Sequence, residues 1–148
     1  MELCKTPNIR SPKPSFTITE DGKVTVTGYN NYVITKDIII PNNINNNLSK
    51  YKVLKDYLLP EIIQDNSVLD LGCGTGFWSI LASRNGATDV FALDMDKEHL
   101  NIISKVTSYF SIRNIRLIHM DIKECKIKAD IVLALAIIHW IYSCTTIM

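Results

Sequence analysis

Three glycines, Gly72, Gly74 and Gly76, are the residues of this chain whose type and spacing most directly suggest chemistry. They stand in LDLGCGTGF, after a short apolar run and before an apolar pattern with helical spacing. Glycine lets the backbone turn tightly between a strand and a helix, and it brings a ligand close to free amide groups. The arrangement predicts a nucleotide-type binding site, and the alternative is a turn with a structural role only.

The residue that follows the third glycine narrows the class of ligand. The dinucleotide fingerprint GxGxxG would place its third glycine at position 77, where this chain has Phe77. A cradle for a pyrophosphate group, as in nicotinamide-dependent oxidoreductases, is therefore disfavoured.

An acidic residue, Asp94, ends the next apolar run and lies 24 positions after Asp70. A carboxylate at the end of the second strand of such a unit can accept hydrogen bonds from both hydroxyls of a ribose. Asp96 competes for this role, but its place before a helical pattern fits a helix N-cap better. We therefore predict Asp94 as the ribose ligand.

The elements that must position these residues alternate between strand and helix patterns. Apolar runs at residues 67–72, 90–94, 115–118 and 131–136 predict strands. Apolar stripes of helical spacing lie between the first and second runs and between the second and third. This alternation is typical of an α/β fold with a parallel sheet and right-handed crossovers.

The N-terminal third of the chain predicts a different kind of structure. Alternating β-rich runs flank Asp21-Gly22 in FTITEDGKVTVTG, which is typical of a β-hairpin. Residues 42–47 are rich in asparagine and predict a loop or linker. The apolar spacing that follows predicts a helix over residues 48–58, which Pro60 interrupts.

The composition bounds the partners and the compartment. The 148 residues are 47% hydrophobic, which is enough for one core. Sixteen basic and fifteen acidic side chains leave a net charge of +1, so we expect no strong nucleic-acid signal and no membrane partner. The four cysteines form no CxxC pair, so we expect neither a metal site nor a disulfide. We predict an intracellular, cytoplasmic protein.

Three short motifs carry a family resemblance. VLDLGCGTG, then ALDMD, then HMDI after the third strand pattern resemble the class I S-adenosylmethionine-dependent methyltransferases in both wording and order, over roughly residues 66–139. The resemblance implies that Asp70 and the glycine loop receive the methionine part of S-adenosylmethionine and that Asp94 holds the ribose. It also implies that Asp121 approaches the adenine amino group, although a local capping role is an equal alternative for this residue.

The resemblance also implies an architecture. The expected fold is a Rossmann-like, mostly parallel sheet with strand order 3-2-1-4, preceded by an N-terminal β-hairpin. Residues 1–47 would hold the hairpin and the asparagine-rich linker. Residues 48–148 would hold a partial methyltransferase domain from which the C-terminal strands of the family are missing. The fourth strand then forms a sheet edge, where a second copy in a homodimer or a completing chain could pair.

The methyl acceptor is expected to bind after the fourth strand, which continues here as ALAIIHWIYSC. His139 is the obvious proton acceptor in this stretch, and we predict that it positions or deprotonates the acceptor. A buried, satisfied histidine beside Trp140 is the alternative. We predict an enzyme of the transferase class that performs S-adenosylmethionine-dependent methylation of an unidentified acceptor. A non-catalytic S-adenosylmethionine-binding or partner module is the alternative.

Overall fold

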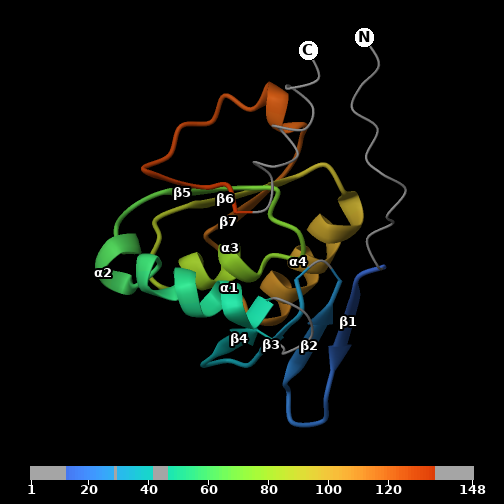
Figure 1. Cartoon of the computed structure of the whole chain (residues 1–148). Coiled ribbons are helices and arrows are strands. Elements are labelled where there is room, and N and C mark those ends of the chain that lie inside the picture. Colours follow the sequence, from blue (N-terminus) through green and yellow to red (C-terminus); the bar gives the residue numbers. More distant parts are fainter. Residues whose placement is uncertain (1–12, 29, 42–46, 136–148) are drawn as a thin grey trace.

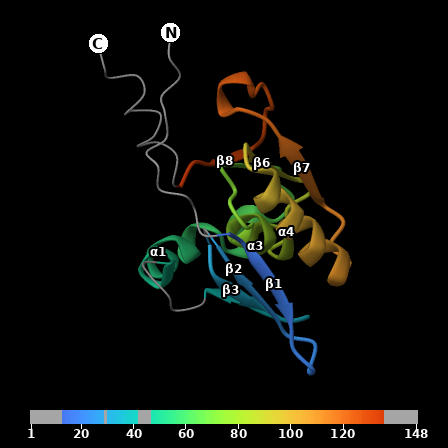
Figure 2. The same cartoon turned by 90° about the vertical axis from the view of Figure 1, so that its right-hand side faces the viewer.

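The computed structural model describes residues 13–28, 30–41 and 47–135 of the chain. Within them, a parallel sheet and an antiparallel sheet enclose a layer of helices (Figure 1). Figure 2 shows the same order of layers from the side, with α3 and α4 between the two sheets. The site described below lies where the upper sheet meets the helices.

The parallel sheet contains the four strands that the sequence predicts. They are β5 (Val68–Leu71), β6 (Val90–Asp94), β7 (Ile115–His119) and β8 (Ile131–Leu133). Their order is β7-β6-β5-β8 and each neighbouring pair is parallel, which confirms the expected 3-2-1-4 arrangement and the α/β class. Because the strands are parallel, their carboxyl ends share one edge, where the glycine loop follows β5 and Asp94 ends β6.

Two helices, α3 (Phe77–Arg84) and α4 (Lys97–Tyr109), pack on the inner face of this sheet. α4 begins where the Asp96 carboxylate accepts a hydrogen bond from the Glu98 amide at 2.9 Å, which confirms the predicted N-cap. Among the helices of the described residues, none has the length and apolar character of a membrane span.

The segment before β5 is less regular than the sequence predicts. The expected helix over residues 48–58 is divided into α1 (Asn47–Leu54) and the 3-10 turn η1 (Lys55–Tyr57). Pro60 opens a further short helix, α2 (Pro60–Ile63). Proline suits this first position, where its missing amide donor is not needed and its fixed φ already fits a helix.

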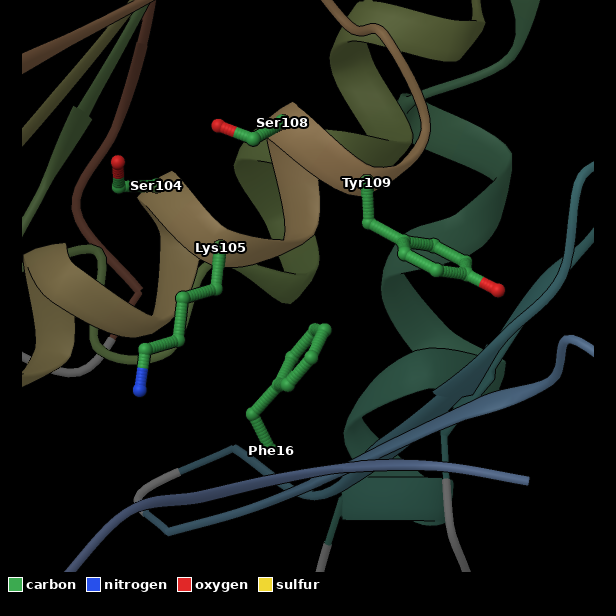
Figure 3. Close-up of a pocket in the computed structure, with 5 residues that line it drawn as sticks. All are labelled: Phe16, Ser104, Lys105, Ser108 and Tyr109. Carbon is green, nitrogen blue, oxygen red and sulfur yellow. The ribbon is translucent and has the colours of Figure 1, made fainter.

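The N-terminal segment forms a four-stranded antiparallel sheet, which is more than the predicted hairpin. Its strands, in spatial order, are β1 (Ser15–Ile18), β2 (Val24–Thr27), β3 (Tyr32–Ile34) and β4 (Ile39–Pro41). The predicted hairpin is β1 and β2, joined through Asp21-Gly22. Along the margin of the sheet, the Phe16 and Tyr109 rings meet edge to face with centroids 6.4 Å apart, which joins β1 to α4 (Figure 3).

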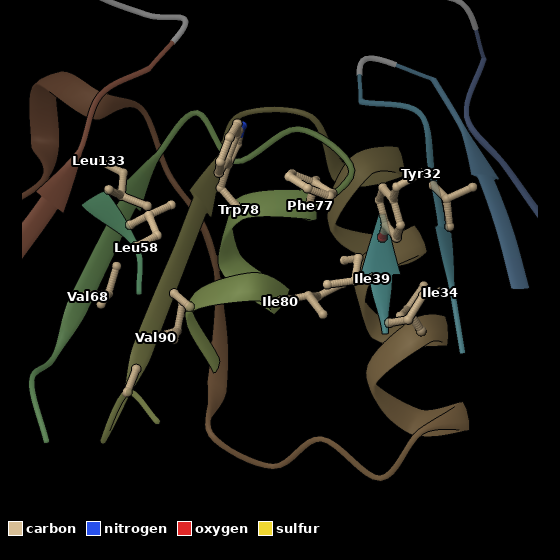
Figure 4. Close-up of a cluster of buried hydrophobic side chains, with 14 of the residues drawn as sticks. Tyr32, Ile34, Ile39, Leu58, Val68, Phe77, Trp78, Ile80, Val90 and Leu133 are labelled. Atoms are coloured by element: carbon tan, nitrogen blue, oxygen red, sulfur yellow. The ribbon is translucent and has the colours of Figure 1, made fainter. Parts of the chain in front are cut away.

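One apolar core joins the two sheets through α3 (Figure 4). Buried residues from the antiparallel sheet, α3 and the parallel sheet belong to the same cluster, among them Val26, Tyr32, Ile34, Phe77, Ile80, Val68 and Val90. The Tyr32 and Phe77 rings, for example, have centroids 5.9 Å apart. The N-terminal sheet therefore packs as a layer of the same core that supports β5 and β6.

Candidate functional site

The glycine loop joins the end of β5 to the start of α3. Gly72, Gly74 and Gly76 all have positive φ values, of 71°, 56° and 95°, which residues with a side chain rarely adopt. At Gly76 a Cβ atom would also lie 2.6 Å from Cγ1 of Ile103, so the absence of a side chain lets α3 pack closely against α4. The three glycines are thus required by the backbone path.

The amide groups of the loop are engaged within the protein, which corrects the expectation that they stay free for a ligand. The amides of Gly72 and Cys73 both donate to the Leu93 carbonyl, at 2.9 and 3.0 Å, and Gly76 donates to the Cys73 carbonyl at 3.0 Å. The Gly74 amide donates to Oδ2 of Asp94 at 2.8 Å. The loop folds back onto the end of β6, so these four amides form no anion cradle.

Asp94 lies against the glycine loop, as the order of the strands predicts. Its Oδ2 accepts from the Gly74 amide and its Oδ1 accepts from the Asp96 amide at 2.8 Å, while its side chain is 13% exposed. A carboxylate has about four lone-pair sites, so each oxygen retains the capacity for another hydrogen bond. The residue is therefore both fixed in place and able to accept from ligand hydroxyls.

His99, which the sequence analysis did not single out, lies between two carboxylates. Its Nδ1 is 3.6 Å from Oδ2 of Asp94 and its Nε2 is 3.7 Å from Oδ2 of Asp96, and the residue is 5% exposed. Burial lowers the pKa of His99, but the hydrogen bond and charge of Asp94, with the charges of Asp96 and Glu98, outweigh it and leave the pKa above its ordinary value. The i to i+3 spacing from Asp96 at the start of a helix was the available sequence signal.

Asp70 is buried on β5 beneath the loop, with only 3% of its surface exposed. Burial raises its pKa to about 6; the hydrogen bond from Ser79 Oγ to Oδ2, at 2.7 Å, acts in the opposite direction, and the charge of Asp94 raises the pKa further. The negative charge of Asp94 therefore acts on Asp70 at the edge of the sheet. A carboxylic acid whose pKa is raised toward neutral pH in this way is a common feature of functional sites.

Asp121 lies after β7, next to the end of β6. The Met120 amide donates to the Asp94 carbonyl at 3.2 Å, which joins the two strand ends. The Asp121 carboxylate itself accepts from the Lys123 amide at 3.0 Å and caps the 3-10 turn η2 (Ile122–Glu124). The capping alternative is therefore realised, and it leaves the adenine role as a prediction.

His139, the residue predicted to position or deprotonate the methyl acceptor, lies outside the described residues. In the described ranges, no group of three or more His, Cys, Asp or Glu side chains is arranged to hold a metal ion.

Sequence reasoning missed Asn30 and Tyr32, whose hydrogen bonds to Cys73 and Thr75 bring the N-terminal sheet to the glycine loop. No sequence signal connects these distant positions.

Comparison with known proteins agrees with this geometry. Residues 68–146 match the family model described as a methyltransferase domain. The chain is similar to the ribosomal protein L11 methyltransferase of Thermoanaerobacter pseudethanolicus, with 34% identity over 82 residues, which is 55% of this chain and 25% of that protein. The protein of the same name from Acetivibrio thermocellus is 35% identical over 79 residues, which is 52% of this chain and 25% of that protein. The chain thus spans about a quarter of the length of the curated relatives it matches.

A solved structure shows the same fold. The ribosomal protein L11 methylase of Lactobacillus delbrueckii subsp. bulgaricus is 22% identical, with a TM-score of 0.53 over 59% of this chain and 46% of that one. The family match includes the glycine loop, Asp94 and Asp121 and covers more than half of the chain. The chain belongs to the class I S-adenosylmethionine-dependent methyltransferase family.

Proposed function

We propose that the chain binds S-adenosylmethionine at the carboxyl ends of β5 and β6 and takes part in methyl transfer to an acceptor. The observation that carries the proposal is the hydrogen bond from the Gly74 amide to Asp94, because it brings the carboxylate proposed to bind the ribose next to the glycine loop. When bound, S-adenosylmethionine supplies a sulfonium methyl group that an acceptor can take by in-line displacement. The chain then mainly binds and orients the reacting groups.

The polar residues of the site fit the parts of this cofactor. The remaining lone pairs of Asp94 suit the two ribose hydroxyls. Asp70, ionised above pH about 6, suits the cationic amino group of the methionine part, because a nearby positive charge favours the ionised carboxylate. The loop amides already donate hydrogen bonds within the protein, and Phe77 replaces the third glycine of the dinucleotide fingerprint. Both features disfavour binding of a dinucleotide pyrophosphate at the same place.

The names of the relatives suggest the first acceptor to test. The two curated relatives described above are ribosomal protein L11 methyltransferases, so a ribosomal protein is the candidate acceptor class. His139, which follows β8 in the chain, is proposed to position or deprotonate the acceptor. β8 is the edge strand of the described sheet, and pairing there with a second copy or a completing chain is proposed to supply further structure.

The test is calorimetric titration of the whole chain with S-adenosylmethionine and S-adenosylhomocysteine. We expect micromolar binding that Asp94→Ala weakens about a hundredfold. Asp89→Ala is the matched control, because Asp89 precedes the same strand, has a side chain that is 40% exposed and forms its one side-chain ion pair in the described residues with Arg116. Absence of binding by the folded wild-type chain would refute the proposal.

Transfer is measured separately, with labelled S-adenosylmethionine and either ribosomal protein L11 or fractions of a cell extract. Label in a protein acceptor, reduced in His139→Ala, would support catalysis. Binding without transfer to any fraction would favour the alternative function, a non-catalytic S-adenosylmethionine-binding module.

A further inference from the structure

The turn between β2 and β3, together with Tyr32 at the start of β3, is hydrogen-bonded to Cys73 and Thr75, the two residues that separate the three glycines. Tyr32 Oη donates to the Thr75 carbonyl at 2.7 Å, and Thr75 Oγ1 donates to the Asn30 carbonyl at 2.5 Å. The Asn30 amide donates to Thr75 Oγ1 at 3.2 Å, and Asn30 Nδ2 donates to the Cys73 carbonyl at 3.4 Å. Four hydrogen bonds thus connect the N-terminal sheet to the loop.

On the side of the glycine loop and Tyr32 these contacts are shielded from water, whereas Asn30 is half-buried. Tyr32 and Thr75 are fully buried, and Cys73 is 1% exposed. Because Thr75 is buried, its hydroxyl is directed to the turn and is not available to a ligand in solution. The buried hydrogen bond from Tyr32 to the Thr75 carbonyl is not readily exchanged for a bond to water, so it restricts the backbone of the loop.

The turn is shaped for this close approach. The Gly28 amide donates to Oδ1 of the buried Asn31 at 2.8 Å, which closes the turn on itself. Gly28 has a φ of 145°, and a Cβ atom there would lie 3.0 Å from Cγ2 of Thr75 and 3.1 Å from Cβ of Pro14. A side chain at this position would press directly on the loop residue that the turn holds.

We propose that the β2–β3 turn and the adjoining start of β3 are part of the cofactor site, in which Asn30 and Tyr32 are positioning residues that hold the glycine loop in its binding conformation. The inference rests on the proposed function, since the loop is the part that receives the methionine portion of the cofactor. Three glycines with positive φ give the loop a wide choice of conformations when it is not held. Holding it before the ligand arrives removes an ordering cost from binding.

The main test is Tyr32→Phe, which removes one hydroxyl and keeps the ring against Phe77. We expect the dissociation constant for S-adenosylhomocysteine, measured by calorimetry, to rise about tenfold, the effect of one hydrogen bond. The control is Asn114→Ala, which removes two hydrogen bonds at the other end of α3. Asn114 Nδ2 donates to the Ala87 carbonyl at 2.9 Å, and its Oδ1 accepts from Ser83 Oγ. The control should lower the melting temperature but leave the affinity unchanged.

A second pair of variants separates the hydrogen bonds of Thr75 from its shape. Thr75→Val keeps the volume and loses the hydroxyl, so it should weaken binding. Thr75→Ser keeps the hydroxyl and should restore binding to near the wild-type value. Equal affinity of folded Tyr32→Phe, Thr75→Val and wild-type chains would overturn the inference.

A readout without ligand keeps the two proposals distinguishable. Amide hydrogen exchange at Gly74 and Gly76 in the unliganded chain should be faster in Tyr32→Phe and unchanged in Asn114→Ala. If the wild-type chain does not bind the cofactor, the proposed function fails and this exchange difference still tests whether the turn holds the loop. Unchanged exchange in Tyr32→Phe would refute the positioning role.

Discussion

The glycine loop is held from two sides, and the two sides use different chemistry. On the side of β6, Asp94 binds the Gly74 amide, and His99 lies between Asp94 and Asp96. On the side of the N-terminal sheet, the neutral groups of Asn30 and Tyr32 bind Cys73 and Thr75. One loop is thus held by charged groups on one side and by neutral groups on the other. Burial raises the pKa of Tyr32, so the neutral side should not respond to pH near neutrality.

The two sides also differ in what they offer a ligand. Asp94 retains hydrogen-bonding capacity and is partly exposed, whereas Tyr32 and Thr75 are fully buried and can act only through the loop. The charged side is therefore expected to bind the cofactor directly, and the neutral side to position the backbone.

The largest effect is expected when both sides are removed in a double-mutant cycle. Asp94→Ala alone should weaken S-adenosylhomocysteine binding about a hundredfold, because it removes charge-assisted hydrogen bonds. In the Asp94→Ala background, Tyr32→Phe should raise the dissociation constant by less than the tenfold expected in the wild-type background, because the loop is already released. Strictly additive effects, measured by competition calorimetry, would contradict the view that both sides hold one conformation.

Replacing the buried acid should raise stability and lower affinity. Asp70 has a pKa of about 6 in the folded chain, against an ordinary value of 3.8, so its stabilising contribution is complete below pH about 4 and is lost as the pH rises to about 6. Asp70→Asn should therefore be more stable than the wild type by roughly 2–3 kcal/mol at pH 8, with no advantage at pH 3.5. Denaturant unfolding at the two pH values measures this difference, and equal gains at both would refute it.

The same acid should make cofactor affinity depend on pH. Between pH 5 and pH 7 the wild-type chain should bind S-adenosylhomocysteine more tightly as Asp70 ionises, because the carboxylate then faces the cationic amino group. Asp70→Asn should bind more weakly at pH 7 and show a flatter profile. The neutral side provides the contrast, since the ratio of the Tyr32→Phe and wild-type dissociation constants should stay at about tenfold across this range.

The smallest effect is expected for His99→Gln. The raised pKa of His99 means that its stabilising contribution is complete below its unfolded pKa and is lost as the pH rises through the folded value. Relative to the wild type, the melting temperature of the variant should therefore fall more at pH 5.5 than at pH 9. Asn114→Ala, which removes neutral contacts, should lower the melting temperature by the same amount at both; a pH-independent loss in His99→Gln would mean that packing alone explains its role.

The α/β core was readable from the sequence because its signals are local. The apolar runs predicted β5 to β8, the glycines marked the turn after β5, and Asp96 marked the start of α4. The family motifs then gave the strand order, which the structure confirms. Each of these signals depends on residues within a few positions of one another, where spacing alone fixes which side chains share a face.

The N-terminal sheet could be predicted only in part. The Asp21-Gly22 turn predicted the hairpin of β1 and β2, but β3 and β4 are short and no comparable turn sequence marks them. The fate of the loop amides was also hidden, because the acceptor carbonyl of Leu93 lies on the next strand. For Asp121, the sequence left capping and adenine binding open, and the tertiary structure supplied the capped turn.

By itself, the sequence determined the parallel core, the glycine loop and the carboxylates that face it, since periodicity, capping and glycine conformations are local properties. Only the tertiary structure decided that Tyr32 and Asn30 reach the loop and that His99 lies between Asp94 and Asp96. Contacts such as the one between Tyr32 and Thr75 join residues 43 positions apart, and they exist because both sheets bury their apolar faces against the same helix. Burial of that shared core, rather than any local pattern, brings the neutral side of the loop into place.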